Sequence, residues 1–310
     1  MSKHIQRILI AGGTGFVGEA LRRRLREDGH AIRLLVRSPD DAERYLAAGY
    51  ETTFGNVRDA QSLFASLTDV DAIINLVAIV RESGEATFEE INFRGTANLV
   101  DAACQAGISR FIQMSAIGAA NIPDFPYHHT KWRAETYVRD RIADWTIIRP
   151  SIIFGPSPEH HFQFIAQLAD LLRQGPLVPI PGDGGARFQP IHTDDVAGVF
   201  AGVLDDPSAY GQTLEIAGPE TLTYREMMDE VARTLEISKP FVNVPIPLVR
   251  LGARILTYMP LVESPVTPGQ LDMLQIDNTT DVNAAESILN RPLAPFRGGL
   301  DFLRNLDEVS

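Results

Sequence analysis

The chain has 310 residues, with 28 Lys and Arg against 40 Asp and Glu, so its formal net charge is −12. This charge excludes a nucleic-acid binder that is held by bulk positive charge. Hydrophobic residues make up 45% of the chain and charged residues 22%, so it can bury a full core, in one large domain or two, and is not intrinsically disordered.

The sequence carries no signal for export or for membrane insertion. It has no signal-peptide pattern, and no run of eighteen uncharged apolar residues that could span a bilayer. Its single cysteine, Cys104, cannot form an internal disulfide and is expected to be a small core residue of a helix. We therefore expect a cytoplasmic protein.

Strand-like and helical segments alternate over the first 150 residues. Strands are predicted at 7–11, 31–37, 72–78, 111–114 and 145–149, and helices at 16–26, 59–67, 89–106 and 127–142. Parallel strands need crossovers, and those crossovers are helices. The alternation therefore predicts an α/β fold, with a doubly wound parallel sheet that helices cover on both faces.

The pattern loosens after residue 150, where prolines and the glycine turn at 182–185 interrupt it. One more strand is predicted at 213–217, and Thr223 and Glu226 form a capping box that opens a helix. We expect a first domain of residues 1–155, completed by about 192–218. A smaller C-terminal lobe of residues 156–191 and 219–310 would bind the substrate or a partner.

Three glycines, Gly12, Gly15 and Gly18, are spaced three apart between the first strand and the first helix. Glycine allows a tight turn, a close approach of the backbone to a pyrophosphate, and close packing of helix on strand. The helix N-terminus adds free N–H groups and partial positive charge. The motif predicts a Rossmann dinucleotide site rather than a glycine turn without a ligand. Its expected contacts are Gly12, Gly13, Thr14, Gly15, Phe16, Val17 and Gly18.

The end of the second predicted strand indicates which coenzyme binds. An NAD site usually places Asp or Glu there for the ribose 2′-hydroxyl, whereas this chain has Arg37 and Ser38 and no carboxylate before Asp40. Arg37 can form a charge-assisted fork to a 2′-phosphate, with Ser38 as a second donor. We predict NADP(H) in preference to NAD(H); the alternative is that Arg37 is a solvated surface residue.

Together these motifs resemble the short-chain dehydrogenase/reductase superfamily, in the extended or atypical branch that includes NAD-dependent epimerases and dehydratases. The resemblance covers most of the chain and rests on residues 12–18, 55–59, 92–96, 127–131, 149–156 and 192–196. Within that branch the chain is similar to the group around the nucleotide-binding accessory subunit of respiratory complex I. The residues that indicate this group are 74–77, 115–118, 144–146, 187–190 and 277–278.

The resemblance implies a catalytic pair, in which Tyr127 is the general acid or base and Lys131 binds the nicotinamide ribose. Residues four apart share one face of a helix, and a nearby ammonium is expected to lower the tyrosine pKa. It also implies that Ser115 holds the reacting oxygen and that Asn92 supports the site; the alternative for Asn92 is a structural role. Relatives typically have two or three hydroxyl residues where this chain has one serine in residues 115–118, and this departure favours weak or absent catalysis.

The remaining predicted contacts lie further along the chain. The resemblance implies coenzyme contacts from Asn56, Val57, Val77, Ala78, Lys131 and Pro150. Asn56 stands where relatives commonly have Asp, and its amide can still form hydrogen bonds. Arg187 is predicted to bind an anionic substrate group or to form a structural salt bridge. No metal site is predicted, because the paired histidines at 128–129 and 160–161 diverge on a helix.

Residues 247–260 predict an amphipathic helix with an apolar stripe opposite Arg250 and Arg254. One possibility is that this helix packs on the small lobe. The alternative is that it lies on anionic lipid or docks to a membrane complex, and this alternative would place the protein at the inner face of a membrane. No oligomeric state is predicted.

Two functions follow from the sequence. The first is an NADP(H)-dependent oxidoreductase for an unidentified small-molecule substrate, a carbonyl, an alcohol or a compound like a nucleotide sugar. The second is a non-catalytic NADPH-binding accessory or assembly subunit of a respiratory complex. The pair of Tyr127 and Lys131 favours the enzyme, and the resemblance to the complex I subunit favours the second.

Overall fold

The computed structural model describes residues 5, 7–157, 161, 163–249, 251 and 276–304. The chain divides into two compact units. Unit 1 comprises Met1–Pro150, Thr193–Ile216 and Val282–Pro292, and unit 2 comprises Ser151–His192, Ala217–Asp281 and Leu293–Ser310. Residues 282–292 therefore belong with the first unit, although the sequence suggested the small lobe, because the helix they contain packs on a helix of unit 1.

Unit 1 is built on a seven-stranded sheet in the order β11-β6-β5-β4-β1-β2-β3. Its strands are β1 (Arg7–Ala11), β2 (Ala31–Val36), β3 (Glu51–Phe54), β4 (Ala72–Asn75), β5 (Arg110–Met114), β6 (Asp144–Pro150) and β11 (Gln212–Ile216). Every pairing in this sheet is parallel. The central strands are buried along almost their whole length, as expected for a parallel sheet covered on both faces. The predicted doubly wound fold is confirmed.

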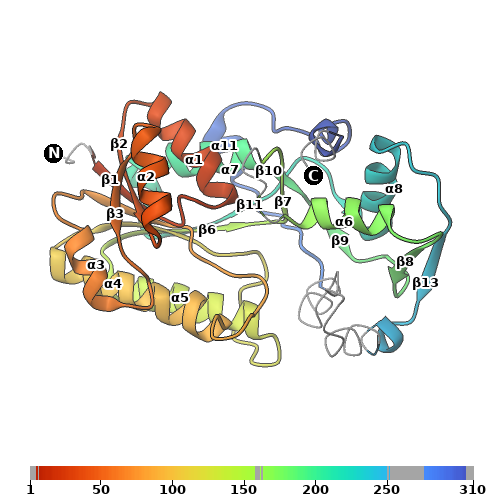
Figure 1. The fold of residues 1–310 in the computed structure, drawn as a ribbon, viewed down its shortest axis with the longest axis horizontal. Helices are drawn as coiled ribbons and strands as arrows, with labels where there is room; N and C mark the ends of the chain where they lie inside the picture. The colour runs from red at the N-terminus through yellow and green to blue at the C-terminus, as the bar shows by residue number, and fades with distance from the viewer. Residues whose placement is uncertain are drawn as a thin grey trace. The chain divides into compact units, whose positions relative to one another are not determined.

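Helices cover both faces of this sheet (Figure 1). On one face lie α1 (Phe16–Glu27), α2 (Pro39–Ala47), α7 (Thr193–Gly202) and α11 (Ala285–Leu289); on the other lie α3 (Ala60–Ser66), α4 (Gly95–Ala106) and α5 (Pro126–Arg141). The core under α3, α4 and α5 includes Leu9, Ile73, Leu99 and Phe111. Across the sheet, α7 is packed so closely on α11 that a Cβ on Gly198 would lie 2.7 Å from the Leu289 side chain.

The segment predicted as one helix over 89–106 consists of a π-helix, η1 (Glu89–Arg94), followed by α4. The expectation that Cys104 lies in the core was wrong, because its side chain is exposed. The buried face of α4 carries Leu99, Val100 and Ala103, and one residue further along the helix turns the side chain about 100° away from that face.

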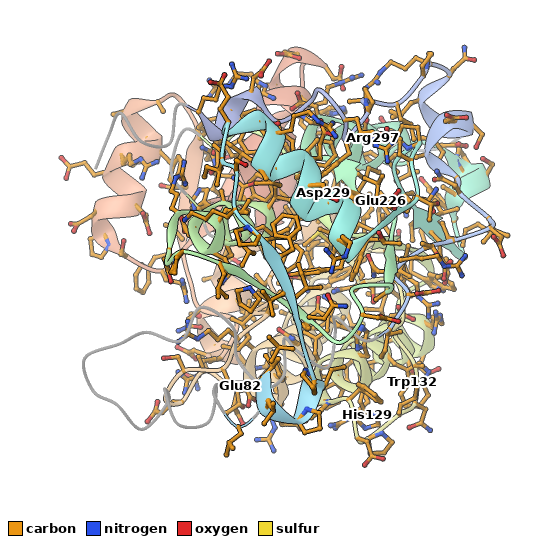
Figure 2. All side chains as sticks on the ribbon, turned by 90° about the vertical axis from the view of Figure 1, so that its right-hand side faces the viewer. Glu82, His129, Trp132, Glu226, Asp229 and Arg297 are labelled. Atoms are coloured by element: carbon orange, nitrogen blue, oxygen red, sulfur yellow. The ribbon has the colours of Figure 1, made fainter. Side chains whose placement is uncertain are left out.

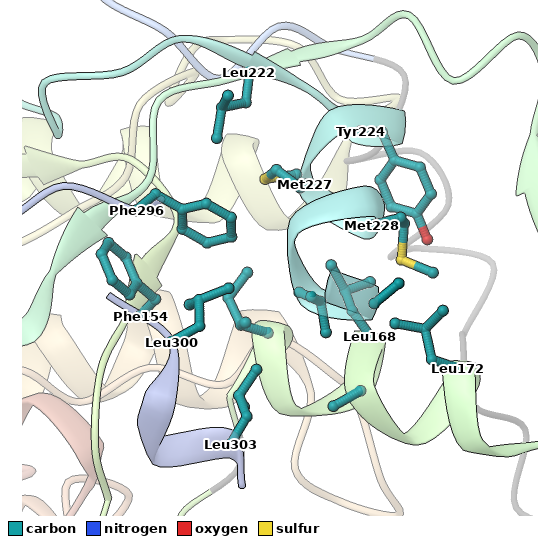
Figure 3. Close-up of a cluster of buried hydrophobic side chains, with 14 of the residues drawn as sticks. Phe154, Leu168, Leu172, Leu222, Tyr224, Met227, Met228, Phe296, Leu300 and Leu303 are labelled. Carbon is teal, nitrogen blue, oxygen red and sulfur yellow. The ribbon is translucent and has the colours of Figure 1, made fainter. Parts of the chain in front are cut away.

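Unit 2 has its own core around two helices. Its elements are β7 (Ile153–Phe154), α6 (Phe164–Arg173), β8 (Val178–Pro181), β9 (Arg187–Phe188), β10 (Ile191–His192), β12 (Leu222–Thr223), α8 (Tyr224–Thr234), β13 (Phe241–Val244) and η3 (Asp301–Leu303). Side chains of α6 and α8 meet Phe154, Phe296 and Leu300 in one apolar cluster (Figure 3). The predicted capping box is confirmed: Glu226 N donates to Thr223 Oγ1 at 3.1 Å, and Thr223 N donates to Glu226 Oε2 at 2.8 Å. Glu226 also pairs with Arg297 at 3.5 Å (Figure 2).

None of the helices among the described residues is both long and apolar enough to cross a membrane. Of the predicted amphipathic helix, residues 250 and 252–260 lie outside the described part of the chain. Within the described part, Leu248 and Leu251 are exposed.

Candidate active site

The strand order reverses at β1, which pairs with β2 on one side and with β4 on the other. In an open α/β sheet, ligands bind beyond the carboxyl ends of the strands at this reversal. The glycine turn follows β1 at Ala11, and Leu76 follows β4. The two strand ends are joined by a hydrogen bond of 2.8 Å from Leu76 N to Ala11 O.

Three glycines of the turn are required by the protein's own packing. Gly12 has a φ of +80°, and a Cβ there would lie 3.0 Å from the Leu76 backbone. A Cβ on Gly18 would lie 2.5 Å from Gly12 O, and one on Gly13 would lie 2.7 Å from the Leu34 side chain. These glycines let the turn fold tightly and let α1 start against it.

Gly15 is not required by the protein's own packing. Its φ of −93° suits any residue, and the nearest atom to an added Cβ is Gly12 O, at an ordinary contact distance of 3.5 Å. Gly15 is the N-cap of α1 and provides no side-chain capping bond, and no described residue accepts a hydrogen bond from Thr14 N–H. The turn therefore leaves Gly15 uncrowded and the Thr14 N–H free at a helix N-terminus, which fits a phosphate group.

The end of β2 carries the residues predicted to choose the coenzyme. Arg37 is exposed, and no hydrogen bond or ion pair joins it to another described residue. Ser38 is the N-cap of α2, where its Oγ accepts a hydrogen bond of 3.1 Å from Asp41 N. The Ser38 hydroxyl proton is not used in this cap, so Ser38 can cap the helix and donate to an anion at once.

The other predicted coenzyme contacts follow β3, β4 and β6. Asn56 Oδ1 accepts a hydrogen bond of 3.0 Å from Arg58 N, and Val57 O accepts one of 2.8 Å from Asn98 Nδ2. Val77 and Ala78 follow β4 and are partly exposed, whereas Pro150 at the end of β6 is buried.

Buried Asn75, in β4, organises the chain after this strand. Its Nδ2 donates to Thr96 Oγ1 at 3.2 Å and to Gln113 Oε1 at 2.9 Å, and its Oδ1 accepts from Val77 N at 3.1 Å. Sequence reasoning used Asn75 only as a mark of resemblance and missed this role. A polar residue in an otherwise apolar buried strand was the available signal.

Both polar atoms of the Asn92 side chain form hydrogen bonds with the backbone of Ile79. Its Oδ1 accepts a hydrogen bond of 2.8 Å from Ile79 N, and its Nδ2 donates to Ile79 O at 3.1 Å. The side chain is completely buried and lies in the π-helix η1, an irregularity often found at functional sites. Asn92 therefore holds the segment that follows β4.

Lys131 is brought to the end of β5. Its side chain is 1% exposed, and Nζ donates a hydrogen bond of 2.6 Å to Met114 O. Burial lowers the pKa of Lys131 to about 8, with Glu135 acting in the opposite direction. The next residue after Met114 is Ser115, whose Oγ is buried and has no hydrogen-bond partner. An unused hydroxyl thus lies one residue from the carbonyl that holds the lysine.

Tyr127 precedes Lys131 by one helical turn. Its ring packs edge-on against Phe88, with centroids 5.7 Å apart, and against His128, at 5.3 Å. Burial raises the pKa of Tyr127 to about 12. The expected lowering of the Tyr127 pKa by Lys131 is therefore not found, because desolvation dominates and the ammonium is directed at Met114 O.

The two adjacent histidines of α5 diverge, as expected. His128 packs against Tyr127, and a Cβ on Gly118 would lie 3.1 Å from its ring. His129 stacks on Trp132, with ring centroids 5.9 Å apart (Figure 2). Among the residues that the structure describes, no group of three or more His, Cys, Asp or Glu side chains could hold a metal ion.

Arg187 belongs to unit 2, where it pairs with Asp277. Its Nε and Nη2 donate to Asp277 Oδ2 at 3.0 and 2.8 Å, and its backbone N donates to Oδ1 at 2.9 Å. These bonds lower the pKa of Asp277. Asn278 continues the contact by accepting from Ser151 Oγ at 2.6 Å and from Ile152 N at 2.8 Å. Hydrogen bonds thus join residues 187–190 to residues 277–278, two of the segments on which the resemblance rests.

Buried charged groups that the sequence did not indicate include Arg22 and Glu135. Arg22 is 5% exposed, and its Nη1 donates a hydrogen bond of 2.7 Å to Gly13 O. Its position four residues after Gly18 on the inner face of α1 was the available signal. Glu135 is completely buried and accepts bonds of 2.8 and 2.7 Å from Arg149 and one of 2.8 Å from Arg139.

Similarity to solved structures agrees with this architecture. The dTDP-glucose 4,6-dehydratase of Streptomyces venezuelae, solved with NAD and TYD bound, superposes with a TM-score of 0.74 at 23% identity over 98% of both chains. The UDP-glucose 4-epimerase of Thermus thermophilus, solved in complex with NAD, gives a TM-score of 0.71 at 18% identity over 98% of this chain and all of that one. At these identities the likeness shows the fold.

Curated relatives include enzymes and subunits of a respiratory complex. Subunit 9 of the mitochondrial NADH dehydrogenase (ubiquinone) 1 alpha subcomplex from Arabidopsis thaliana is 27% identical over 89% of this chain and 68% of that protein. The NAD(P)H azoreductase of Xenophilus azovorans is 28% identical over 71% of each chain. The chain spans about two thirds of the length of the mitochondrial relatives it matches. Residues 8–217 match the model of the NAD dependent epimerase/dehydratase family, and the chain therefore belongs to this NAD(P)-binding family.

Proposed function

We propose that the chain is an NADP(H)-dependent oxidoreductase that reduces a carbonyl group of a small molecule. The observation that carries this proposal is the buried Ser115 hydroxyl, which has no hydrogen-bond partner. A buried polar group without a partner costs about 1–3 kcal/mol, so a ligand oxygen that bonds to it is favoured. Ser115 follows Met114, whose carbonyl accepts the hydrogen bond from Lys131, and Lys131 lies one helical turn after Tyr127. A carbonyl-binding site needs such a hydroxyl, a proton donor and a cation.

The coenzyme assignment rests on the ends of the first two strands. The open turn at Gly15 suits the diphosphate, and exposed Arg37 with the Ser38 hydroxyl suits a 2′-phosphate rather than a free hydroxyl. We assign Asn56 and Val57 to the adenine side. Val77, Ala78, Lys131 and Pro150 are assigned to the nicotinamide side.

The raised pKa of Tyr127 suits proton donation better than proton removal. With a pKa of about 12, the Tyr127 phenol keeps its proton at neutral pH and can donate it to a carbonyl oxygen, whereas it would be a poor base. Ser115 donates a hydrogen bond to the same oxygen and orients it. When bound, the reduced nicotinamide supplies the hydride for the carbonyl carbon.

Two further residues support this chemistry from outside the reacting atoms. With a pKa of about 8, Lys131 is mostly an ammonium at pH 7 and can donate to a ribose hydroxyl while it holds Met114 O. Asn92 acts as a positioning residue through its two bonds to Ile79. Arg187 remains our candidate to bind an anionic group of the substrate, and it would do so while still paired with Asp277.

Turnover with a panel of aldehydes, ketones and quinones tests the proposal by following NADPH oxidation. Tyr127→Phe is expected to lower turnover by about 10²–10⁴-fold and to leave NADPH affinity unchanged within about twofold, since it removes a proton donor. Ser115→Ala is expected to lower turnover as well. Tyr137→Phe is the matched control, because this phenol, on the same helix, bonds to Asp101 at 2.9 Å outside the site.

Full activity of Tyr127→Phe with a substrate that the unaltered protein reduces would refute this mechanism. A panel without any turnover would favour the second candidate function.

The second candidate is a non-catalytic NADPH-binding accessory or assembly subunit of a respiratory complex. The single hydroxyl in residues 115–118, at Ser115, and the 27% identity to a mitochondrial NADH dehydrogenase subunit favour it. It predicts NADPH that stays bound through purification without turnover, together with co-purifying membrane partners. We place the protein in the cytoplasm, and in this second case at the inner face of a membrane, where residues 247–260 would make the contact.

A further inference from the structure

Arg22 lies beneath the glycine turn and is bonded to it. Its side chain is buried, and its Nη1 donates a hydrogen bond of 2.7 Å to Gly13 O. The guanidinium also lies over the ring of Tyr45 in α2, with Cζ 4.7 Å from the ring centroid, and Tyr45 is itself 3% exposed. A guanidinium between a carbonyl and an aromatic face is fixed in place.

The bond from Arg22 determines the direction of a neighbouring donor. Gly13 C=O and Thr14 N–H belong to one planar trans peptide, in which these two groups point in opposite directions. Because Gly13 O points inward at Arg22, Thr14 N–H points to the other side of the turn. No described residue accepts a hydrogen bond from it there.

We propose that Arg22 is a positioning residue for the coenzyme diphosphate: it holds the Gly13–Thr14 peptide in the orientation that presents Thr14 N–H to a phosphate oxygen. The inference rests on the proposed coenzyme site and adds a residue that the glycine motif does not contain. Without Arg22, the Gly13 carbonyl loses its buried donor, and this peptide can turn its oxygen toward the phosphate, which would repel it. The guanidinium also adds positive charge under the turn.

Binding of three ligands distinguishes a role of Arg22 at the diphosphate from a general effect on the stability of the fold. ADP carries the diphosphate, adenosine 2′-monophosphate carries the 2′-phosphate without it, and NADPH carries both. For Arg22→Met, titration calorimetry is expected to show at least about tenfold weaker binding of ADP and NADPH, because a charge-assisted hydrogen bond behind the diphosphate is lost. Binding of adenosine 2′-monophosphate is expected to stay within about twofold.

Arg26→Met is the matched control. Arg26 lies one turn further along α1, where its Cζ is 3.6 Å from the Tyr50 ring centroid and its Nη2 donates to Ala48 O at 2.9 Å. It does not contact the glycine turn through any of these bonds, and its replacement is expected to leave the binding of all three ligands unchanged. Arg22→Lys keeps a cation and a donor, and is expected to recover most of the affinity for ADP.

A measurement on the unaltered chain needs no variant to fold. The Thr14 amide resonance is expected to shift when ADP is added and to stay in place with adenosine 2′-monophosphate. Equal losses for all three ligands in Arg22→Met, or a Thr14 amide that does not respond to bound ADP, would overturn the inference. If the unaltered chain binds neither NADPH nor ADP, the proposed function itself fails; if it binds both and Arg22→Met binds them equally well, only the role of Arg22 fails.

Discussion

Replacing Lys131 with methionine removes a buried charge while it keeps an unbranched side chain of similar length. Burial lowers the pKa of Lys131 from 10.5 to about 8. At about 1.36 kcal/mol per pKa unit, this difference of roughly 2.5 units means that the charged form destabilises the folded state by about 3 kcal/mol. Met114 O keeps a second donor, Gln113 Nε2 at 2.9 Å, so the substitution does not leave this carbonyl unpaired.

The pH window follows from the direction of the shift. Below pH 8, Lys131 is protonated in both the folded and the unfolded chain, and the full penalty is present. Between pH 8 and 10.5 the unfolded chain binds more protons than the folded one, so stability rises with pH, and above 10.5 the penalty is gone. The methionine variant has no such term. Its stability relative to the unaltered protein is therefore expected to fall by about 3 kcal/mol between pH 7.5 and 10.5.

Urea unfolding of both proteins across this pH range measures that difference, since other titrating groups cancel between them. Lys239→Met is the control for lost hydrogen bonds, because Lys239 Nζ donates to Leu172 O at 2.7 Å at the end of α6, in unit 2. A stability difference between Lys131→Met and the unaltered protein that stays constant from pH 7.5 to 10.5 would refute the claim that Lys131 is buried as a charge.

Two further predictions test the glycine turn and the ion pair of Glu135 with Arg149. Gly15→Ala is expected to weaken NADPH binding at least about tenfold with little change in the free energy of unfolding, because its Cβ would meet only Gly12 O, at an ordinary contact distance of 3.5 Å. Gly18→Ala is expected to lower that free energy by about 1–3 kcal/mol, because its Cβ would lie 2.5 Å from Gly12 O. Calorimetry and urea unfolding measure both effects, and equal stability losses would contradict this division. Glu135→Gln removes the buried carboxylate that pairs with Arg149, and is expected to destabilise the protein by about 3–5 kcal/mol in the same unfolding assay. A loss below about 1 kcal/mol would contradict a stabilising role of this ion pair.

Sequence patterns predicted several elements of unit 1 whose residues are strongly buried. Strands β1 and β4 are short apolar runs, and α1 repeats apolar residues at helical spacing, so both periods were visible. Helix α2 and strand β3 were missed, because α2 buries only Tyr45 and β3 has no fully buried residue. Where an element buries little, its hydrophobic pattern carries little information.

The same distinction holds for the site. The glycine spacing and the interval between Tyr127 and Lys131 are local patterns, and they could be recognised before the fold was known. The clamp of Asn92 on Ile79, the pairing of Arg187 with Asp277 and the burial of Arg22 arise only when distant segments meet. The direction of the tyrosine pKa shift also depended on burial, which spacing alone does not reveal.

Titration calorimetry with NADPH and NADH on the full chain, and on its Arg37→Ala variant, measures most directly whether the turn after β1 holds a dinucleotide. The unaltered protein is expected to bind NADPH at least about tenfold more tightly than NADH, because a charge-assisted bond to the 2′-phosphate is present only with NADPH. Arg37→Ala is expected to remove this preference and to keep the binding of NADH. Absence of binding heat with both coenzymes in the unaltered protein would contradict the account.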